Sequence, residues 1–376
     1  MMRRPRTRRR PRVALLLSTL APVLLGGCPL PTPNKPNNQS SDPLALDKEA
    51  NDSLPTATAL AFDAGGKLRF TGTIDRAADT DVYALGRLAA GDRIVADVQR
   101  VSGSLDAVVA VFDDREYLVA MNDDRDPDGN DLNPLLDIVL RGDEGDYYLG
   151  IIAYPGERST GKYEVALRIE RAVGVPDPQA QLVFLNWAGG TNVIIPNVGV
   201  YNLSPFSAID VGLPDTVTER LKDRVQEIVA ERYAGFDLTV LNSDDDPEPT
   251  VAHSTVYFGG RDSQAFAISQ QIDTFNADPS DRAIVYTGSY RGAFFVTPTL
   301  EQMAQALGNT VAHEVGHLLG LVHTADCNDL MDTTCANERL LGGQDFSTAE
   351  LDDSVWPWGY QAAREILGWV LGLIGL

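Results

Sequence analysis

Three of the four histidines in this chain fall between positions 313 and 323, in a segment with the pattern of a helix. The predicted helix covers Thr299–Leu319 and ends at Gly320. His313 and His317 would lie one turn apart on one face, which suits two nitrogen ligands of a single Zn²⁺ ion. Gly320 can adopt a positive φ without a Cβ clash, so a sharp turn there would return His323 as the third ligand. This spacing predicts a catalytic zinc site whose fourth position stays open to water.

Glu314 stands directly after the first of these histidines. From that position its carboxylate can reach water at the open site without itself becoming a ligand. Zinc lowers the pKa of bound water to roughly 7, and a carboxylate beside it can act as the general base. The residues therefore predict hydrolysis of a peptide bond, with Glu314 as the catalytic group.

The complete pattern, His-Glu-x-x-His-x-x-Gly-x-x-His, resembles that of the metzincin metallopeptidases. Their second signature is a methionine turn, and Asp329-Leu-Met331-Asp332 stands in the matching place. The resemblance implies that Met331 packs beneath the zinc without binding it, and it favours an endopeptidase with a cleft open at both ends. Thr333 occupies the place where several subgroups carry a tyrosine that assists the oxyanion, so that role is expected to be absent. Thr324, after the third histidine, assigns no subgroup.

Residues 181–376, which include the histidine motif, alternate between strand and helix patterns. This alternation predicts an α/β catalytic domain with a mixed sheet, the active-site helix and a C-terminal helix within 347–376. A further helix is expected over Thr216–Tyr233, where apolar residues recur every three or four positions. The expected strands are Gln181–Trp187, Asp237–Leu241, Ser254–Phe258 and Ala283–Tyr286.

Residues 45–170 show short strand patterns separated by Gly and Asp turns, which favour an all-β antiparallel sandwich or barrel. Patches such as Asp79-Thr-Asp-Val-Tyr83 and Gly145-Asp-Tyr-Tyr148 resemble bacterial pre-peptidase C-terminal (PPC) domains. The resemblance implies a sandwich that binds substrates or surfaces, here placed before the peptidase instead of after it. A linker is expected over 171–180, which holds two prolines and a glycine. The expected strands are Lys67–Thr73, Asp81–Leu85, Arg93–Val98, Ala107–Phe112, Tyr147–Ile152 and Tyr163–Ile169.

Residues 1–27 have the organisation of an export signal, with arginines followed by an apolar run too short to span a membrane comfortably. The run closes on Leu25-Gly-Gly-Cys28, which resembles the bacterial lipobox and implies cleavage before Cys28 and lipid on its sulfur. An ordinary secretion signal is the alternative. Residues 28–44 are rich in proline, asparagine and serine, which predicts a flexible tether. We therefore expect a lipoprotein anchored in the cell envelope, on the outer surface or in the periplasm.

The other two cysteines, Cys327 and Cys335, lie on either side of Met331. In an oxidising compartment a short disulfide loop is expected, and a pair of free buried thiols is the alternative.

An acidic segment before Gly129 suggests a second metal. Asp124, Asp126 and Asp128 alternate as they do in calcium loops, where hard oxygens surround a hard cation. Leu135 stands where an EF-hand needs its glutamate, so a solvated hairpin tip is an equal interpretation.

The net charge bears on which classes of partner the chain can bind. Removing the seven arginines of the first twelve residues leaves 24 basic and 53 acidic side chains, a net charge of −29. Such a surface repels phosphate backbones, so nucleic acid is not an expected partner. The expected partners are a protein or peptide substrate and, through the lipid on Cys28, a membrane. Two alternatives remain: a surface-binding or adhesion lipoprotein whose peptidase fold is a scaffold, and a zinc hydrolase of non-peptide amides.

Overall fold

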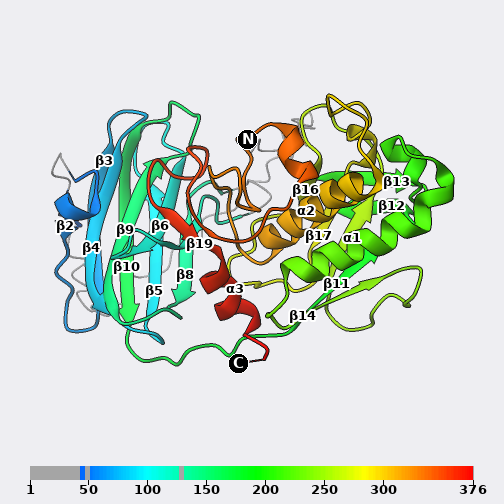
Figure 1. Cartoon of the computed structure of the whole chain (residues 1–376). Helices are drawn as coiled ribbons and strands as arrows, with labels where there is room; N and C mark the ends of the chain where they lie inside the picture. Colours follow the sequence, from blue (N-terminus) through cyan, green and yellow to red (C-terminus); the bar gives the residue numbers. More distant parts are fainter. Residues whose placement is uncertain (1–42, 47–50, 127–130, 376) are drawn as a thin grey trace, which may run out of the picture.

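The computed structural model describes residues 43–46, 51–126 and 131–375. It contains two bodies, which we call the sandwich (residues 44–170) and the α/β unit (residues 181–375); Figure 1 shows them side by side. The predicted signal over 1–27 and Cys28 lie outside the described residues, as does the tether up to residue 42. Leu44, assigned to the tether, already belongs to a strand. Within the described residues no helix is both long and apolar enough to cross a membrane.

The sandwich consists of two five-stranded sheets, with strand orders β1-β3-β10-β5-β8 and β2-β4-β9-β6-β7. All pairings are antiparallel except those of the two-residue strands β1 and β2. Each of the six strands expected from the sequence lies within an observed one. The strands are β1 (Leu44–Ala45), β2 (Thr58–Ala59), β3 (Lys67–Ile74), β4 (Thr80–Leu88), β5 (Arg93–Arg100), β6 (Ala107–Asp113), β7 (Leu118–Asn122), β8 (Leu135–Val139), β9 (Gly145–Ala153) and β10 (Gly161–Glu170).

Burial along the strands tells which faces of the sandwich are covered. In β10 buried and more exposed residues alternate, as expected for a strand with one face on the core and one in water. In β6 all seven residues are buried. Its inward residues belong to the core of the sandwich, whereas Val108, Ala110 and Phe112 point outward into a second apolar cluster. That cluster also contains Val322 and Trp356 of the α/β unit, so the two bodies are packed together.

The α/β unit is built on a five-stranded mixed sheet of order β14-β11-β15-β17-β16, in which only β16 runs antiparallel to its neighbour. The sequence predicted four of these strands and missed the short edge strand β16. A hairpin, also missed, packs Val193, Ile195 and Leu203 against one face of the sheet. The strands are β11 (Gln181–Asn186), β12 (Gly190–Ile195), β13 (Gly199–Leu203), β14 (Leu238–Asn242), β15 (Ser254–Phe258), β16 (Ala267–Ser269) and β17 (Arg282–Val285), where β12 and β13 form the hairpin.

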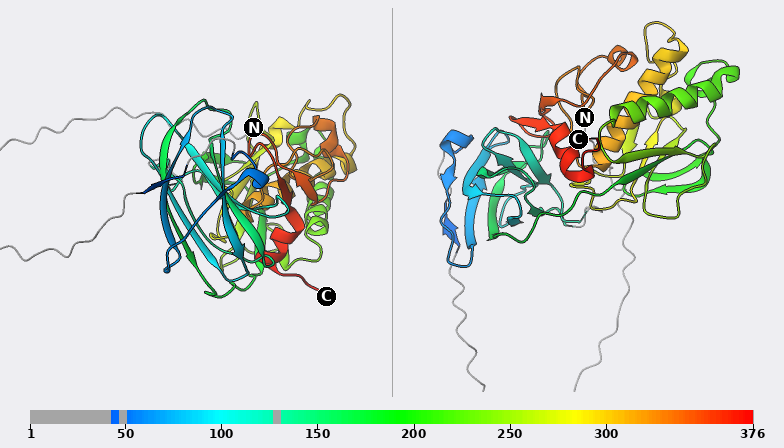
Figure 2. Two further views of the ribbon diagram at one scale, coloured as in Figure 1. Left: turned by 90° about the vertical axis from the view of Figure 1, so that its left-hand side faces the viewer. Right: turned by 60° about the horizontal axis from the view of Figure 1, so that its bottom comes forward.

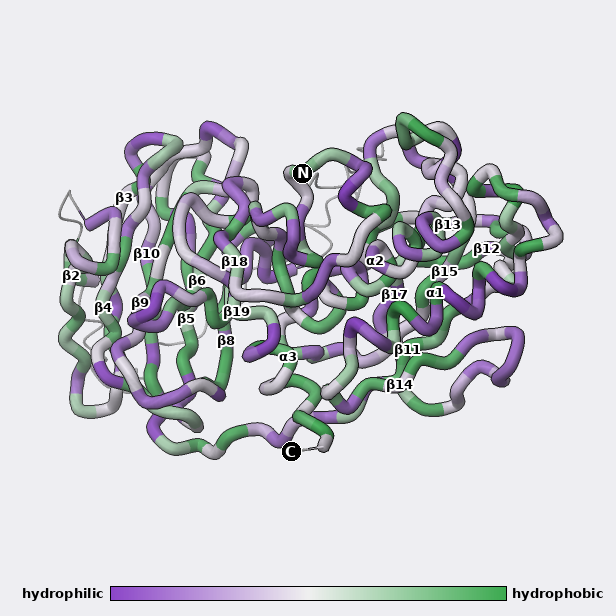
Figure 3. Tube along the Cα trace, viewed as in Figure 1, coloured by the Kyte–Doolittle hydropathy of each residue, from purple (hydrophilic) through white to green (hydrophobic). Residues whose placement is uncertain are grey.

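Two helices cover the opposite face of this sheet: α1 (Thr218–Arg232) and α2 (Leu300–Leu318). Both were predicted to within two residues. Figure 3 shows hydrophilic and hydrophobic stretches alternating along α1, whose apolar residues face the core. Thr299 caps the start of α2, because its hydroxyl accepts a hydrogen bond from the backbone N–H of Gln302.

The C-terminal helix is shorter than expected. Only α3 (Ala363–Leu371) is helical, and before it the chain forms a small hairpin of β18 (Thr348–Glu350) and β19 (Tyr360–Ala362). Pro357 and Gly359, with φ of +95° at the glycine, explain why no helix continues through this stretch. Figures 1 and 2 show the hairpin and α3, in red, between the two bodies.

Candidate metal centre

The structure brings His313, His317 and His323 together. The first two lie one turn apart on α2, and the third follows the turn at Gly320. One ring nitrogen of each can be chosen so that all three lie within 4.8 Å of one another. Nε2 of His317 lies 3.0 Å from Nε2 of His323.

The hydrogen bonds of His313 and His317 leave one nitrogen of each ring available to bind a metal. Nδ1 of His313 lies 2.8 Å from the carbonyl oxygen of Leu330, and Nδ1 of His317 lies 2.8 Å from that of Leu321. A carbonyl only accepts, so each Nδ1 carries the proton and each Nε2 keeps its lone pair for a ligand. Two nitrogens on one tetrahedral zinc lie roughly 3.3 Å apart, close to the separation found here. The residues present therefore fit a zinc ion held by three Nε2 atoms.

His323 is held differently from the other two. Its Nδ1 is buried and has no hydrogen-bond partner among the residues that the structure describes. Hydrogen bonds hold the backbone around His323 instead. The carbonyl of His323 accepts from the N–H of Asp352, and the N–H of Thr324 donates to the carbonyl of Met331. The position of this ring thus depends on the segment that carries it.

Burial sets the protonation state of all three rings. It lowers the pKa of His317 to about 3, with a further contribution from the neighbouring His313. It also lowers the pKa of His313, and it takes the pKa of His323 well below the ordinary value. Neutral imidazole is the form that binds a metal, so the site is ready to bind at neutral pH without losing protons.

Glu314 is 5% exposed and lies beside the histidines on the wall of a cavity. Burial raises the pKa of its carboxyl to about 8, while hydrogen bonds from the backbone and hydroxyl of Ser269 act in the other direction. Ser269 ends the edge strand β16, so this strand helps to orient the carboxylate. A dication held by the three rings would lower the pKa of Glu314 and favour its ionised form.

The cavity in front of the histidines has a volume of about 300 Å³. One wall comes from residues 264–267, which lead into β16, and the other from residues 332–340, which lead into the short 3₁₀ helix η5 (Asn337–Leu341). Thr333 lies on the second wall. His313 and His323 thus border a space that can admit part of a substrate.

Two glycines shape the turns beside the metal centre. Gly320 has φ of +94°, and a Cβ there would lie 3.0 Å from the carbonyl oxygen of Asp273. Gly316, between the two histidines of α2, leaves room for Met331, because a Cβ there would lie 2.8 Å from the Met331 sulfur. Met331 belongs to the segment that we call the methionine turn (residues 329–332), and it is fully buried against this turn of the helix.

Asp329 organises the methionine turn, a role that the sequence did not reveal. Its carboxylate is fully buried. One oxygen accepts from the Thr324 hydroxyl and the Met331 N–H, both at 2.9 Å. The other accepts from the N–H and hydroxyl of Ser347, at 2.8 and 2.6 Å. The turn is therefore fixed both to the segment after His323 and to the segment before β18.

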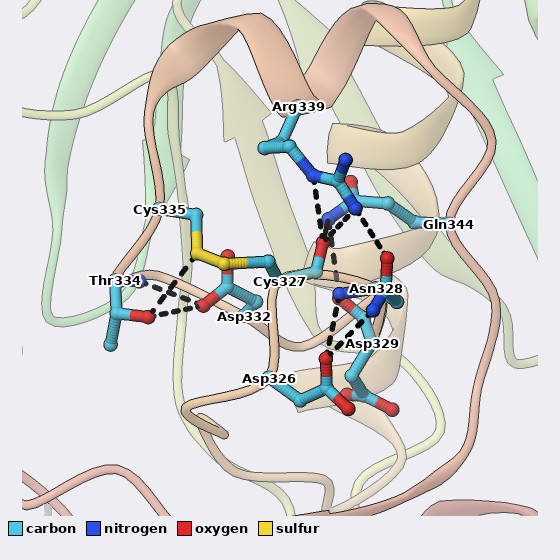
Figure 4. The surroundings of a disulfide bond; sticks show 9 residues. All are labelled: Asp326, Cys327, Asn328, Asp329, Asp332, Thr334, Cys335, Arg339 and Gln344. Atoms are coloured by element: carbon cyan, nitrogen blue, oxygen red, sulfur yellow. Dashed lines mark hydrogen bonds between the residues drawn. A yellow bond between two sulfur atoms is a disulfide. The ribbon is translucent and has the colours of Figure 1, made fainter.

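A disulfide joins Cys327 to Cys335, so the structure contains the first of the two expected arrangements. Figure 4 shows it beside the Arg339 side chain, which donates to the carbonyl of Cys327. The bridge spans eight positions and encloses the methionine turn. Because Cys335 also lines the cavity, the bridge ties one cavity wall to the metal centre.

The proposed calcium loop receives no support from the described residues. Their only groups of three close metal-binding side chains are the histidines and a set formed by Cys327, Asp332 and Cys335. Asp124 and Asp126 belong to neither group, and Asp128 lies outside the described residues. Calcium binding there stays a prediction.

Comparison with known proteins gives structural neighbours of limited extent. No family model matches the chain, and no curated protein matches it. The PPC domain of a collagenase from Bacillus anthracis is 18% identical, with 30% of this chain and 94% of that chain covered and a TM-score of 0.23. Archaemetzincin from Methanopyrus kandleri is 16% identical, with 45% and 89% covered and a TM-score of 0.27.

Proposed function

We propose that this chain is a zinc-dependent metallopeptidase that hydrolyses peptide bonds. The observation that carries the proposal is the convergence of three histidines beside a buried carboxylate at the wall of a cavity. Two of the rings have their Nδ1 protons fixed by carbonyl groups, which leaves Nε2 free to bind a metal. A purely structural site would not need Glu314, so its presence favours an enzyme over a scaffold for binding or adhesion.

His313, His317 and His323 would hold the ion. Bound zinc supplies Lewis acidity, which lowers the pKa of water and polarises a substrate carbonyl. Glu314 would take a proton from the attacking water and deliver it to the nitrogen of the leaving amine. The N–H and hydroxyl of Ser269 would keep the carboxylate in place for both transfers.

We propose a protein or peptide as the substrate. The cavity of about 300 Å³ can receive one side chain together with its adjoining backbone. Cleavage within a chain, as an endopeptidase, is the form of the activity that the metzincin-like motif implies.

The test combines metal analysis with digestion of a peptide library. We expect about one zinc per chain, cleavage of the library, loss of cleavage after a chelator and recovery when zinc is returned. Zinc without peptide cleavage would favour the hydrolase of other amides. Neither zinc nor cleavage would favour a binding lipoprotein.

We also propose that the chain is exported and anchored by lipid on Cys28. The small residues before this cysteine, and the proline-rich stretch after it, support the proposal. Expression in a bacterial host with a radiolabelled fatty acid should label the wild type and leave Cys28→Ser unlabelled. Equal labelling of the two would contradict lipid attachment at this position.

A further inference from the structure

The metal centre has one ligand whose ring is not oriented by its own hydrogen bond. His313 and His317 are each fixed through Nδ1, whereas Nδ1 of His323 has no partner among the described residues. A ring without such a bond can turn, and ligand orientation contributes strongly to metal affinity. Whatever holds the backbone beside His323 therefore helps to hold the metal.

Val322, the residue before His323, is clamped by a buried side chain. Its N–H donates to Oε1 of Gln361 at 2.7 Å, and its carbonyl accepts from Nε2 of Gln361 at 2.9 Å. Gln361 is fully buried in β19. Because the amide satisfies both backbone groups, the position of Val322 follows that of β19.

β19 in turn is joined to the sandwich. The N–H of Tyr360 donates to the carbonyl of Glu116 at 2.9 Å. The Arg115 guanidinium forms an ion pair of 2.9 Å with Glu365 in α3. Gly359 permits the close approach, since a Cβ there would lie 2.9 Å from the carbonyl oxygen of Glu116. Only Gln361 and Val322 therefore separate this contact from the third histidine.

Apolar packing reinforces the same connection. The side chains of Val322 and Trp356 are buried in one cluster with the outward residues of β6. The Trp356 ring lies 5.2 Å from the ring of Phe112, centroid to centroid. The indole ring of Trp356 packs directly over Gly150 in β9. A Cβ on Gly150 would lie only 2.5 Å from this ring, so the contact requires a glycine. The surface of the sandwich is thus shaped to this part of the α/β unit.

We propose that the sandwich is a fixed part of the metal centre, which positions His323 through β19, Gln361 and Val322. Gln361 acts through the backbone of Val322, and Trp356 acts through the apolar cluster that it shares with Val322, so both are positioning residues. Removing the sandwich would therefore weaken metal binding instead of releasing an active enzyme. The expected effect on zinc binding rests on the proposed function. The expected effect on the backbone at Val322 rests on the interface alone.

The test uses Gly150→Val in the full chain. Gly150 lacks a positive φ and its Cβ would point out of the sandwich core, so the substitution should displace Trp356 and leave the sandwich folded. Gly145→Val is the matched control in the same strand, because a Cβ there meets only the exposed Asp114 side chain. Gln361→Met tests the clamp directly, and the milder Gly150→Ala serves if the valine variant does not fold.

Two readouts decide the matter: the zinc dissociation constant, from competition with a chelator, and hydrogen exchange at the Val322 N–H. We expect at least tenfold weaker zinc binding and faster exchange in Gly150→Val and Gln361→Met, with wild-type values in Gly145→Val. Unchanged exchange and affinity in folded Gly150→Val would overturn the inference, as would an equal loss in Gly145→Val. If the wild type binds no zinc, the proposed function fails and the exchange at Val322 still decides the positioning role.

Discussion

Glu314 is the residue on which the proposed chemistry depends. Glu314→Gln keeps the size of the side chain and removes the base, so kcat should fall by roughly 10²–10⁴-fold while bound zinc is retained. Rates from a fluorogenic peptide and metal content from the same preparation measure both quantities. Glu301→Gln is the control, because Glu301 lies on the same helix and is exposed beside Arg224. Full activity in Glu314→Gln would remove this residue from the mechanism.

Asp281 makes the stability of the protein depend on pH. Its carboxyl is fully buried, and burial raises the pKa to about 8 from an unfolded value near 3.8. The folded state therefore keeps a proton that the unfolded state loses between about pH 4 and 8. The contribution of Asp281 to the free energy of unfolding is therefore largest below pH 4. It falls as pH rises, by at most about 1.4 kcal/mol for each pH unit.

Asp281→Asn should remove this dependence, since the amide keeps an oxygen for the Ser254 hydroxyl and does not titrate. Urea unfolding at pH 5, 6, 7 and 8 gives the comparison. We expect the variant to gain stability relative to the wild type at each step. A constant difference across the series would show that Asp281 does not change its protonation on unfolding in this range.

At the scale of elements, the sequence predicts best what is determined locally. The period of apolar residues located α1 and α2, and the intervals between the histidines placed them on one face of α2 and after Gly320. The edge strand β16 has only three residues, and its contact with Glu314 depends on tertiary packing. The role of Asp329 was equally hidden, because Ser347 is brought to it by the fold.

The loop closed by Cys327 and Cys335 is an element whose removal can be measured. Replacing both by serine frees the chain around the methionine turn, and the loss of a short loop constraint costs about 2–3 kcal/mol in the free energy of unfolding. Zinc affinity should fall as well, because Cys335 lines the cavity and Asp329 lies inside the loop. Denaturant curves with and without a reductant provide the measurement. A reductant should destabilise the wild type and leave the double variant unchanged; the same response in both would contradict this role.

At the scale of the whole molecule, the sequence indicated two bodies and gave only one hint that they share a surface. From the sequence alone, we would assign Phe112 to the core of one body, and Val322 and Trp356 to the core of the other. In the fold Phe112 packs in one cluster with the other two, which lie more than two hundred residues further along the chain. No local sequence pattern encodes such a contact. The fully buried strand β6 was the available hint, since its apolar run is longer than a strand with one wet face requires.

A cut in the connecting segment tests how firmly the bodies are joined. A specific protease site placed within residues 174–178 lies between two tie points, the Val173 N–H on Gly91 and the Gln179 N–H on Val370. After cleavage we expect both fragments to elute together from a sizing column at micromolar concentration, with zinc retained. The same cut in Gly150→Val should release them. Separate elution of the fragments from the wild-type background would show that the covalent link, and not the interface, holds the bodies together.

The clamp of Val322 by Gln361 also has a consequence for biosynthesis. During translation α2 and all three histidines emerge from the ribosome before residues 352–361, which supply Trp356 and Gln361. Domains made first can fold first, so the sandwich can stand ready while the ligand segment still lacks its support. The metal centre is therefore expected to close among the last steps of folding. A nascent chain that ends before Gln361 would carry all three histidines and Glu314, and it would still hold zinc poorly.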